Sequence, residues 1–266
     1  MLKLKKLTLA LSAIALVSSP LIAAHKHENN FVGPYVGASL GIGADFGKSR
    51  INVFETATSN FVASLNGRNG QSSILGGVNA GWNWTLPMNN DGNWIAGVDV
   101  FADFSNMHTS DKTLMNDNND PIIKTLRIKT NRKYGFGAGA KIGIVENNIL
   151  WYGSIHWVGS HFHIKGNYNS SDAGFNTNTA TSNKKKFLNG VRTGLGVEMP
   201  IYDNIKLGME AGYSWYQDIS DNVPDARFGG AIAGHRGVVD QTAKFQHKPQ
   251  IMDIKLKAVW SFNGIA

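Results

Sequence analysis

The chain has 266 residues, a formal net charge of +7 and no cysteine. Disulfides and thiolate metal sites are therefore excluded. The 26 Lys and Arg residues are scattered rather than gathered on one face, which argues against nucleic-acid binding.

Residues 1–24 have the features of a cleaved secretory signal peptide. Three lysines precede an apolar run at 7–17, and Ala23 and Ala24 supply the small residues of a cleavage site. The alternative is a membrane-anchor helix, but the apolar run is too short to span a bilayer. We therefore predict export, with a polar leader at 25–34 ahead of the first strand.

The rest of the chain alternates apolar and polar residues with a period of two, which indicates β-strands with unlike faces. In the last strand, Leu256, Ala258 and Trp260 share one parity, and Lys255 and Lys257 share the other. The same test predicts eight strands, at 35–46, 73–86, 93–105, 134–145, 149–164, 188–201, 205–216 and 248–262.

The connections between these strands alternate in length. Short turns are predicted at 87–92, 146–148 and 202–204, from residues that favour turns. Long polar loops are predicted at 47–71, 106–124, 165–186 and 217–247, although the parity of 134–145 is expected to continue back to Leu126 and Ile128. This plan predicts an all-β fold. It is an eight-stranded antiparallel up-and-down transmembrane β-barrel over 35–262, with three short turns, four long loops and a C-terminal tail at 263–266.

Glycine decides between a membrane barrel and a soluble one. The polar face is dominated by glycine, for example at Gly135, Gly137 and Gly139. A small barrel has little interior space, so glycine relieves crowding inside but would only weaken a strand facing water. The polar face therefore points inward, and the apolar face is predicted to contact lipid.

The segments GPYVGASLGIG, GVDVFADFS and GVRTGLGVEMP, together with the closing strand, resemble the OmpA-like family of eight-stranded outer-membrane β-barrels. The resemblance implies a bacterial outer-membrane location, contact with outer-membrane lipids and insertion by the barrel-assembly machinery. It also implies adhesion, host-factor binding or envelope stability as possible roles.

Charged residues on the inward parity are nearly balanced, and we predict that they form an interlocked network inside the barrel. Arg192 is expected at its centre, because its planar guanidinium can hold two carboxylates. Besides Asp45, the predicted lumen residues are Asp99, Asp103, Lys141, Arg192, Glu198, Lys206, Glu210, Asp253, Lys255 and Lys257. The predicted membrane-interface aromatics are Trp82, Trp84, Trp94, Tyr213, Trp215, Trp260 and Phe262.

His161 and His163 are the candidates for a metal or haem site, since residues two apart in a strand share a side. Outer-membrane lipid A deacylases, also eight-stranded, use a His-x-Ser pair, whereas the second position here is His163. No catalytic residue and no cofactor are therefore assigned, and a non-enzymatic protein is predicted.

The leading hypothesis is a monomeric structural and surface-interaction protein with a filled polar lumen, which meets an unidentified extracellular partner through its four long loops. The alternatives are a narrow pore for small solutes and a haem or metal binder or lipid-modifying enzyme at the rim.

Overall fold

The computed structural model describes residues 30–55, 61–68, 71–86, 94–116, 123–172, 175–228 and 239–262. Within these ranges there are twelve β-strands, and no helix is long and apolar enough to cross a membrane. The strands are β1 (Gly33–Asp45), β2 (Lys48–Glu55), β3 (Phe61–Arg68), β4 (Gln71–Leu86), β5 (Trp94–Asn116), β6 (Ile123–Glu146), β7 (Ile149–Asp172), β8 (Phe175–Tyr202), β9 (Ile205–Tyr216), β10 (Ile219–Phe228), β11 (Val239–Lys248) and β12 (Gln250–Ser261).

Eight of these strands close into an antiparallel barrel in the order β1-β12-β9-β8-β7-β6-β5-β4. Closure is made by β1, whose Tyr35 pairs with Gly81 of β4 on one side and with Ser261 of β12 on the other. A closed barrel leaves no unpaired sheet edge, which a strand structure needs in hydrocarbon. The predicted fold class, an all-β eight-stranded antiparallel barrel, is confirmed.

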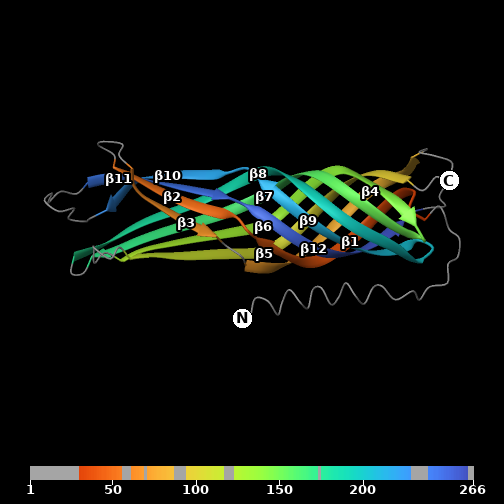
Figure 1. Cartoon of the computed structure of the whole chain (residues 1–266), viewed down its shortest axis with the longest axis horizontal. Helices are drawn as coiled ribbons and strands as arrows, with labels where there is room; N and C mark the ends of the chain where they lie inside the picture. The colour runs from red at the N-terminus through yellow and green to blue at the C-terminus, as the bar shows by residue number, and fades with distance from the viewer. Residues whose placement is uncertain are drawn as a thin grey trace.

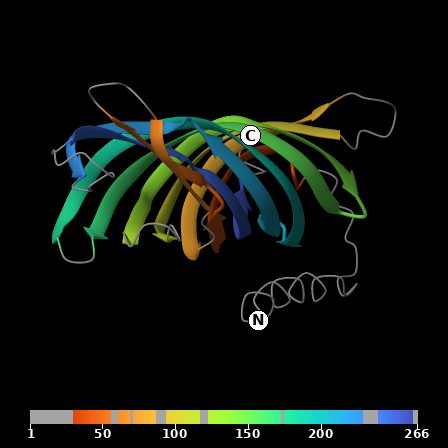
Figure 2. The same ribbon diagram turned by 60° about the vertical axis from the view of Figure 1, so that its left-hand side comes forward.

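The other four strands form a sheet in the order β10-β11-β2-β3, which continues the barrel wall at one end (Figure 1). Only one or two residues separate β1 from β2, β3 from β4, β9 from β10 and β11 from β12. The long strands β5–β8 run through both levels (Figures 1 and 2), and β10 and β3 lie beside β8 and β5. We call the closed eight-stranded part the barrel. We call the four-stranded sheet, together with the parts of β5–β8 that lie beside it, the extension.

The extension corrects the prediction of four long loops, because most of those segments are strand. Segments 48–55, 61–68, 107–116, 165–172, 175–186, 219–228 and 239–247 are all strand. Their Asn-, Ser- and Thr-rich sequences lack a strong apolar alternation, yet their backbones continue the pairing begun in the barrel. The residues at 56–60, 117–122, 173–174 and 229–238, and the predicted turn at 87–92, lie outside the described part of the chain.

The two levels have opposite polarity. In the barrel, large apolar side chains such as Leu40 and Leu195 are exposed at 64% and 74%, whereas Glu198 and Lys206 are buried. In the extension and at its junction with the barrel, a large group of buried side chains is apolar instead: Leu75, Met107, Val158, Phe162, Ile164, Leu188, Ile219, Phe245 and Ile251. The barrel is therefore built for lipid outside, and the extension is built for water outside.

A β-bulge in β6 shows how one strand serves both levels. Its register against β7 shifts between Arg132 and Gly135. Below the shift the odd-numbered residues point inward, as Lys141 does, and above it the even-numbered Thr130 and Arg132 are buried instead. An extra residue in one strand reverses its parity. The expected continuation of one parity toward Leu126 and Ile128 is therefore interrupted at the bulge.

The opposite end of the barrel, which we call the turn end, is closed by residues ahead of β1. Phe31 is buried against Ile95, Leu150 and Tyr152. The side-chain amide of Asn83 donates a hydrogen bond to the carbonyl oxygen of Phe31 at 2.8 Å. The predicted leader at 25–34 thus includes, at its end, a residue that fills the mouth of the barrel, and β1 begins at Gly33 rather than at residue 35.

Candidate functional site

Arg192 of β8 lies at the centre of the polar lumen. Its guanidinium donates hydrogen bonds to Glu210 of β9 and to Asp253 of β12, the latter at 2.7 Å. The strands β8, β9 and β12 are consecutive in the wall, so one side chain joins three neighbours. A Cβ atom on Gly212 would collide with the guanidinium, so glycine at this inward position makes room for it.

Above Arg192, toward the extension, a second cation and carboxylate continue the network. Lys255 donates to both carboxylate oxygens of Asp103, at 2.9 and 3.0 Å. Arg132 approaches the same carboxylate at 3.4 Å and donates to the hydroxyl of Ser160 at 3.0 Å. The hydroxyls of Ser160 and Tyr216 lie 3.1 Å apart, and the ring of Tyr216 packs edge-on against Phe162 of the apolar interior above.

Below Arg192, toward the turn end, Lys257 joins two glutamates. Its ammonium lies 3.2 Å from Glu210 and 3.5 Å from Glu198. The hydroxyl of Tyr152 accepts a hydrogen bond from Lys257 at 3.0 Å and donates one to Glu210 at 2.9 Å. Lys141 lies 3.9 Å from Glu198. This layer extends the ion-pair chain almost to the closed mouth.

Asp99 anchors a side branch of the network. Its carboxylate lies 2.6 Å from Nε2 of His156 on β7, and it accepts a hydrogen bond from the hydroxyl of Tyr35 on β1 at 3.2 Å. All three side chains are buried. The branch ties β5 to the strands on opposite sides of the lumen.

The structure places all ten predicted lumen residues, and Asp45, in the buried interior of the barrel. Nine of the ten contact another predicted member of the set or His156. The exception is Lys206, which donates instead to the carbonyl oxygen of Asn30 at the turn end, at 2.7 Å.

The prediction missed Arg132, because the parity of 134–145 was expected to continue unchanged through this stretch, which would have put Arg132 on the outward face; the bulge reverses it. With Arg132 included, the lumen holds six acidic and six basic side chains, counting Asp45 and excluding histidine. The tyrosines that bridge these charges were also missed. Tyr35 and Tyr152 have the inward parity of their strands, but nothing in a single strand shows which carboxylate on another strand each would reach.

The network leaves little free space. A cavity of about 30 Å³ lies at its centre, between Arg192, Asp99 and Lys255. This is room for about one water molecule. Toward the extension, apolar side chains occupy the interior in place of the charged network, and Leu188 and Phe162 are fully buried there.

The candidate pair His161 and His163 lies on the outer wall of the extension, not in the lumen. The ring of His161 packs near that of Tyr134, with centroids 5.6 Å apart. His163 donates through Nε2 to Oδ1 of Asn183 at 2.6 Å. Within the described ranges, no three His, Cys, Asp or Glu side chains are grouped to hold a metal ion.

A serine, a histidine and an aspartate also meet where β1 passes into β2. The hydroxyl of Ser49 lies 2.9 Å from Nδ1 of His247, and Nε2 of that ring lies 3.7 Å from Asp45. Asp45 accepts hydrogen bonds from the backbone N–H groups of Gly47 at 2.8 Å and Gln250 at 3.3 Å. All three side chains are at most 3% exposed, so the cluster holds the junction of the two levels and offers no hydroxyl to a substrate.

The outer wall of the barrel carries two aromatic zones. Of the predicted aromatics, Trp82, Trp84, Trp94, Trp260 and Phe262 lie toward the turn end, and Tyr213 and Trp215 lie toward the extension. From Ile205 to Trp215, β9 advances ten residue steps, or ~33 Å of strand, which a tilt of ~40° reduces to a height of ~25 Å. That height matches the apolar band of a membrane barrel.

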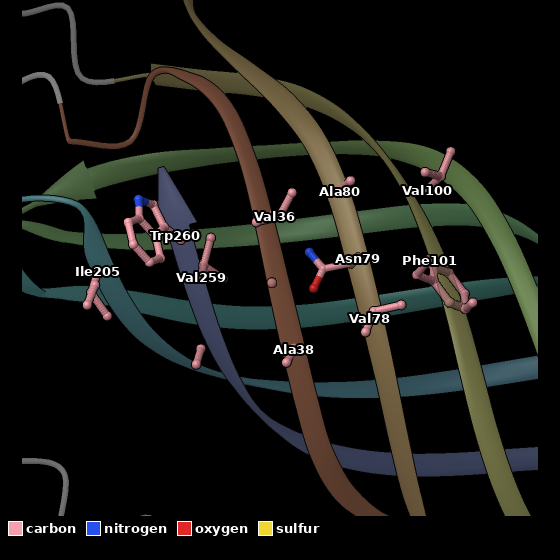
Figure 3. A pocket seen from close by; sticks show the side chains of 13 residues that line it. Val36, Ala38, Val78, Asn79, Ala80, Val100, Phe101, Ile205, Val259 and Trp260 are labelled. Atoms are coloured by element: carbon pink, nitrogen blue, oxygen red, sulfur yellow. The ribbon is translucent and has the colours of Figure 1, made fainter. Parts of the chain in front are cut away.

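Between these zones, the outer wall over β1, β4, β5 and β12 has an apolar depression of about 800 Å³ (Figure 3). Small residues such as Ala38 and Ala80 form part of its lining, beside Val36, Val100 and Trp260. No charged side chain lines it. It lies within the apolar band and is suited to hydrocarbon chains rather than to a polar solute.

A closed barrel with an apolar outer band between aromatic zones and a polar interior is a transmembrane β-barrel. The family model for the outer membrane protein beta-barrel domain matches residues 9–231, and the chain belongs to this family. A search of curated proteins by sequence finds no match.

Solved structures similar to this chain include several outer-membrane barrels. OprG from Pseudomonas aeruginosa has 12% identity and a TM-score of 0.47, covering 88% of this chain and 99% of its own. The outer membrane protease OmpT from Escherichia coli has 12% identity and a TM-score of 0.36, covering 85% and 97%. The attachment invasion locus protein Ail of Yersinia pestis, solved with the heparin analogue sucrose octasulfate, has 11% identity and a TM-score of 0.26, covering 83% and 99%.

Proposed function

We propose that this protein is a non-conducting outer-membrane barrel with a structural and surface-interaction role. The barrel anchors the chain in the membrane. The extension holds its connecting segments away from the membrane, where they meet an extracellular partner. The observation that carries the proposal is the filled lumen, in which the residual cavity of about 30 Å³ is surrounded by the ion-pair network. A through-path for a solute needs a continuous opening, and buried charge pairs that satisfy one another are costly to separate.

The height of the wall supports the surface role. A transmembrane strand needs ~9–11 residues, whereas β5, β6, β7 and β8 have 23, 24, 24 and 28. The surplus builds an extension with its own apolar interior, so its connecting segments start from a rigid platform. Binding residues often lie on loops that a rigid scaffold positions.

Export through a cleaved signal peptide at 1–24 and insertion by the barrel-assembly machinery belong to the same proposal. The charged lumen supports insertion as a closed unit, since its acidic and basic side chains form ion pairs across strands, and these pairs exist only when the strands have met. The eight-stranded barrel is closed and exposes no edge within the membrane for strand exchange, which supports a monomer surrounded by outer-membrane lipid.

Conductance in a planar bilayer tests the proposal. The refolded full chain, confirmed as folded by heat-shifted gel migration, is expected to give no regular current steps. The Asp103→Ala/Lys255→Ala variant removes a neutral pair from the lumen and is expected to leak more than the wild type. Regular steps from the wild-type protein would replace the proposal with a narrow pore for small solutes.

The histidine alternative has a separate test. His161→Ala/His163→Ala is expected to leave both the folded state and any binding to the extracellular partner unchanged. Loss of haem or metal binding, or of a lipid-modifying activity, in that variant would favour the rim-site alternative instead.

A further inference from the structure

The outer wall of the extension carries a group of lysine side chains and one histidine over β6, β7 and β8. We call it the basic patch and define it as Lys129, Lys133, His163, Lys165 and Lys185. Lys129, Lys133, Lys165 and Lys185 are exposed, and His163 is half-buried. The patch is distinct from the lumen network, and none of its members takes part in the ion pairs described above.

Strand register places these residues in two adjacent rows. Lys129 pairs directly with Lys165, which pairs in turn with Asn183. In the next row toward the barrel, His163 pairs with Lys185. Cross-strand neighbours have Cβ atoms ~5 Å apart, so the ammonium groups can converge on one small anion.

The strand segments that carry the patch contain no acidic residue. Segments 129–134, 157–167 and 181–187 contain neither Asp nor Glu. The nearby Lys184 differs, because it forms an ion pair with Asp221 of β10 at 2.6 Å. Like charges directly opposite one another destabilise a strand pair. The Lys129–Lys165 pair therefore costs stability unless an anion lies against it.

The position of the patch indicates which anion. Directly below it on the same strands lie Tyr134, Phe136, Trp157 and Phe187, all exposed on the outer wall. Phe136 stacks on Phe187 with centroids 5.5 Å apart. Aromatic side chains of this kind mark the membrane–water interface. Lys185 is two residues beyond Phe187, so the patch stands roughly 7 Å farther along the strand, at the level of lipid headgroups.

We propose that the basic patch binds the phosphate groups of a phosphorylated lipid in the leaflet that surrounds the extension end of the barrel. Lys129 and Lys165 hold one phosphate between two strands, and Lys185 adds a third cation. The hydrogen bond from His163 to Asn183 fixes the imidazole between the two rows. The aromatic residues below contact the acyl chains of the same lipid.

The test is a binding titration with the full chain in non-ionic dodecyl maltoside micelles. The probe is fluorescent diphosphoryl lipid A, followed by anisotropy, and the comparison probe is the same lipid with both phosphates removed. Cations beside an anionic lipid surface each contribute roughly a fivefold change in affinity, so Lys129→Gln/Lys165→Gln/Lys185→Gln is expected to weaken binding about 100-fold.

The control variant is Lys48→Gln/Lys244→Gln/Lys248→Gln, which removes the same charge from β2 and β11. Lys48 also faces Lys248 across a strand pair, but Asp218 lies 3.6 Å from Lys248 and neutralises it. This variant is expected to bind the phosphorylated probe as the wild type does. Unchanged far-ultraviolet spectra and heat-shifted migration would show that both variants are folded.

Three results would overturn the proposal. The patch variant could retain wild-type affinity, or the dephosphorylated lipid could bind wild type equally well. Sucrose octasulfate or inorganic phosphate could also compete as strongly as unlabelled lipid A, which would make the patch a general anion site without lipid selectivity.

Discussion

Arg192→Met should destabilise the barrel, and the contacts of Arg192 give the magnitude. The substitution keeps an unbranched side chain but removes both carboxylate contacts. Glu210 retains Lys257 at 3.2 Å and the hydroxyl of Tyr152 at 2.9 Å. Asp253 retains only Lys255, at 4.0 Å. Breaking a buried pair so that one charge is left uncompensated costs about 3 kcal/mol, and Asp253 is that charge.

The assay is urea-induced equilibrium unfolding in lipid vesicles, followed by tryptophan fluorescence. We expect Arg192→Met to lower the free energy of unfolding by about 3 kcal/mol, and Arg192→Met/Asp253→Asn to recover about half of that loss. Lys184→Met removes the exposed pair with Asp221 and is expected to cost at most about 1 kcal/mol. A single variant within about 0.5 kcal/mol of wild type, or a double variant no more stable than the single, would refute the central place of Arg192.

Substitutions at four further positions test other parts of the wall in the same unfolding assay. Gly212→Ala is expected to cost about 1–3 kcal/mol because its Cβ would displace the guanidinium of Arg192. Gly153→Ala, whose Cβ would meet only a side-chain atom of Leu195 at 3.8 Å, should change stability by less than about 1 kcal/mol; equal effects at the two glycines would contradict the packing described. Asn148 has φ of 62°, so Asn148→Gly should leave the free energy of unfolding unchanged and Asn148→Val should lower it by about 1–2 kcal/mol. Equal stability of the two variants would count against a left-handed turn residue at this position. Leu188→Ala should lower the free energy of unfolding by about 3 kcal/mol, and the amides of the extension should lose protection from hydrogen exchange before those of the barrel. Protection lost first in the barrel would show that the extension has no core of its own.

The barrel could be predicted from sequence because each of its strands has two different surroundings. Leu195 faces lipid and Arg192 faces the lumen, and buried and exposed residues alternate along β8 between them. The short turn between β6 and β7 could also be predicted from sequence. Asn147 and Asn148 both adopt positive φ, which asparagine tolerates.

The extension could not be predicted in the same way, because its polarity is reversed and its apolar interior is assembled from strands far apart in the chain. Phe162 and Phe245 are both buried there, yet each is flanked by polar residues that resemble a loop. The bulge next to Arg132 also leaves no signature in a single sequence, although it decides that this guanidinium enters the lumen. Phe31 was assigned to a leader because the residues before it are polar.

The contacts within the lumen needed the three-dimensional register as well. Parity alone places Lys206 and Lys257 on the same inner face. Only the height of each residue along the wall shows that Lys206 serves the turn end and Lys257 joins the two glutamates.

The central claim is that one wall of strands has lipid outside its barrel and water outside its extension, with a filled interior throughout. Because the chain has no cysteine, single nitroxide labels can be placed without removing native thiols. Labels at positions 195, 185 and 188, in reconstituted vesicles, would be tested for collision with oxygen and with a water-soluble nickel chelate. We predict that the label replacing Leu195 meets oxygen but not nickel, that the label replacing Lys185 meets nickel, and that the label replacing Leu188 meets neither. Nickel access at 195 or at 188 would contradict the account.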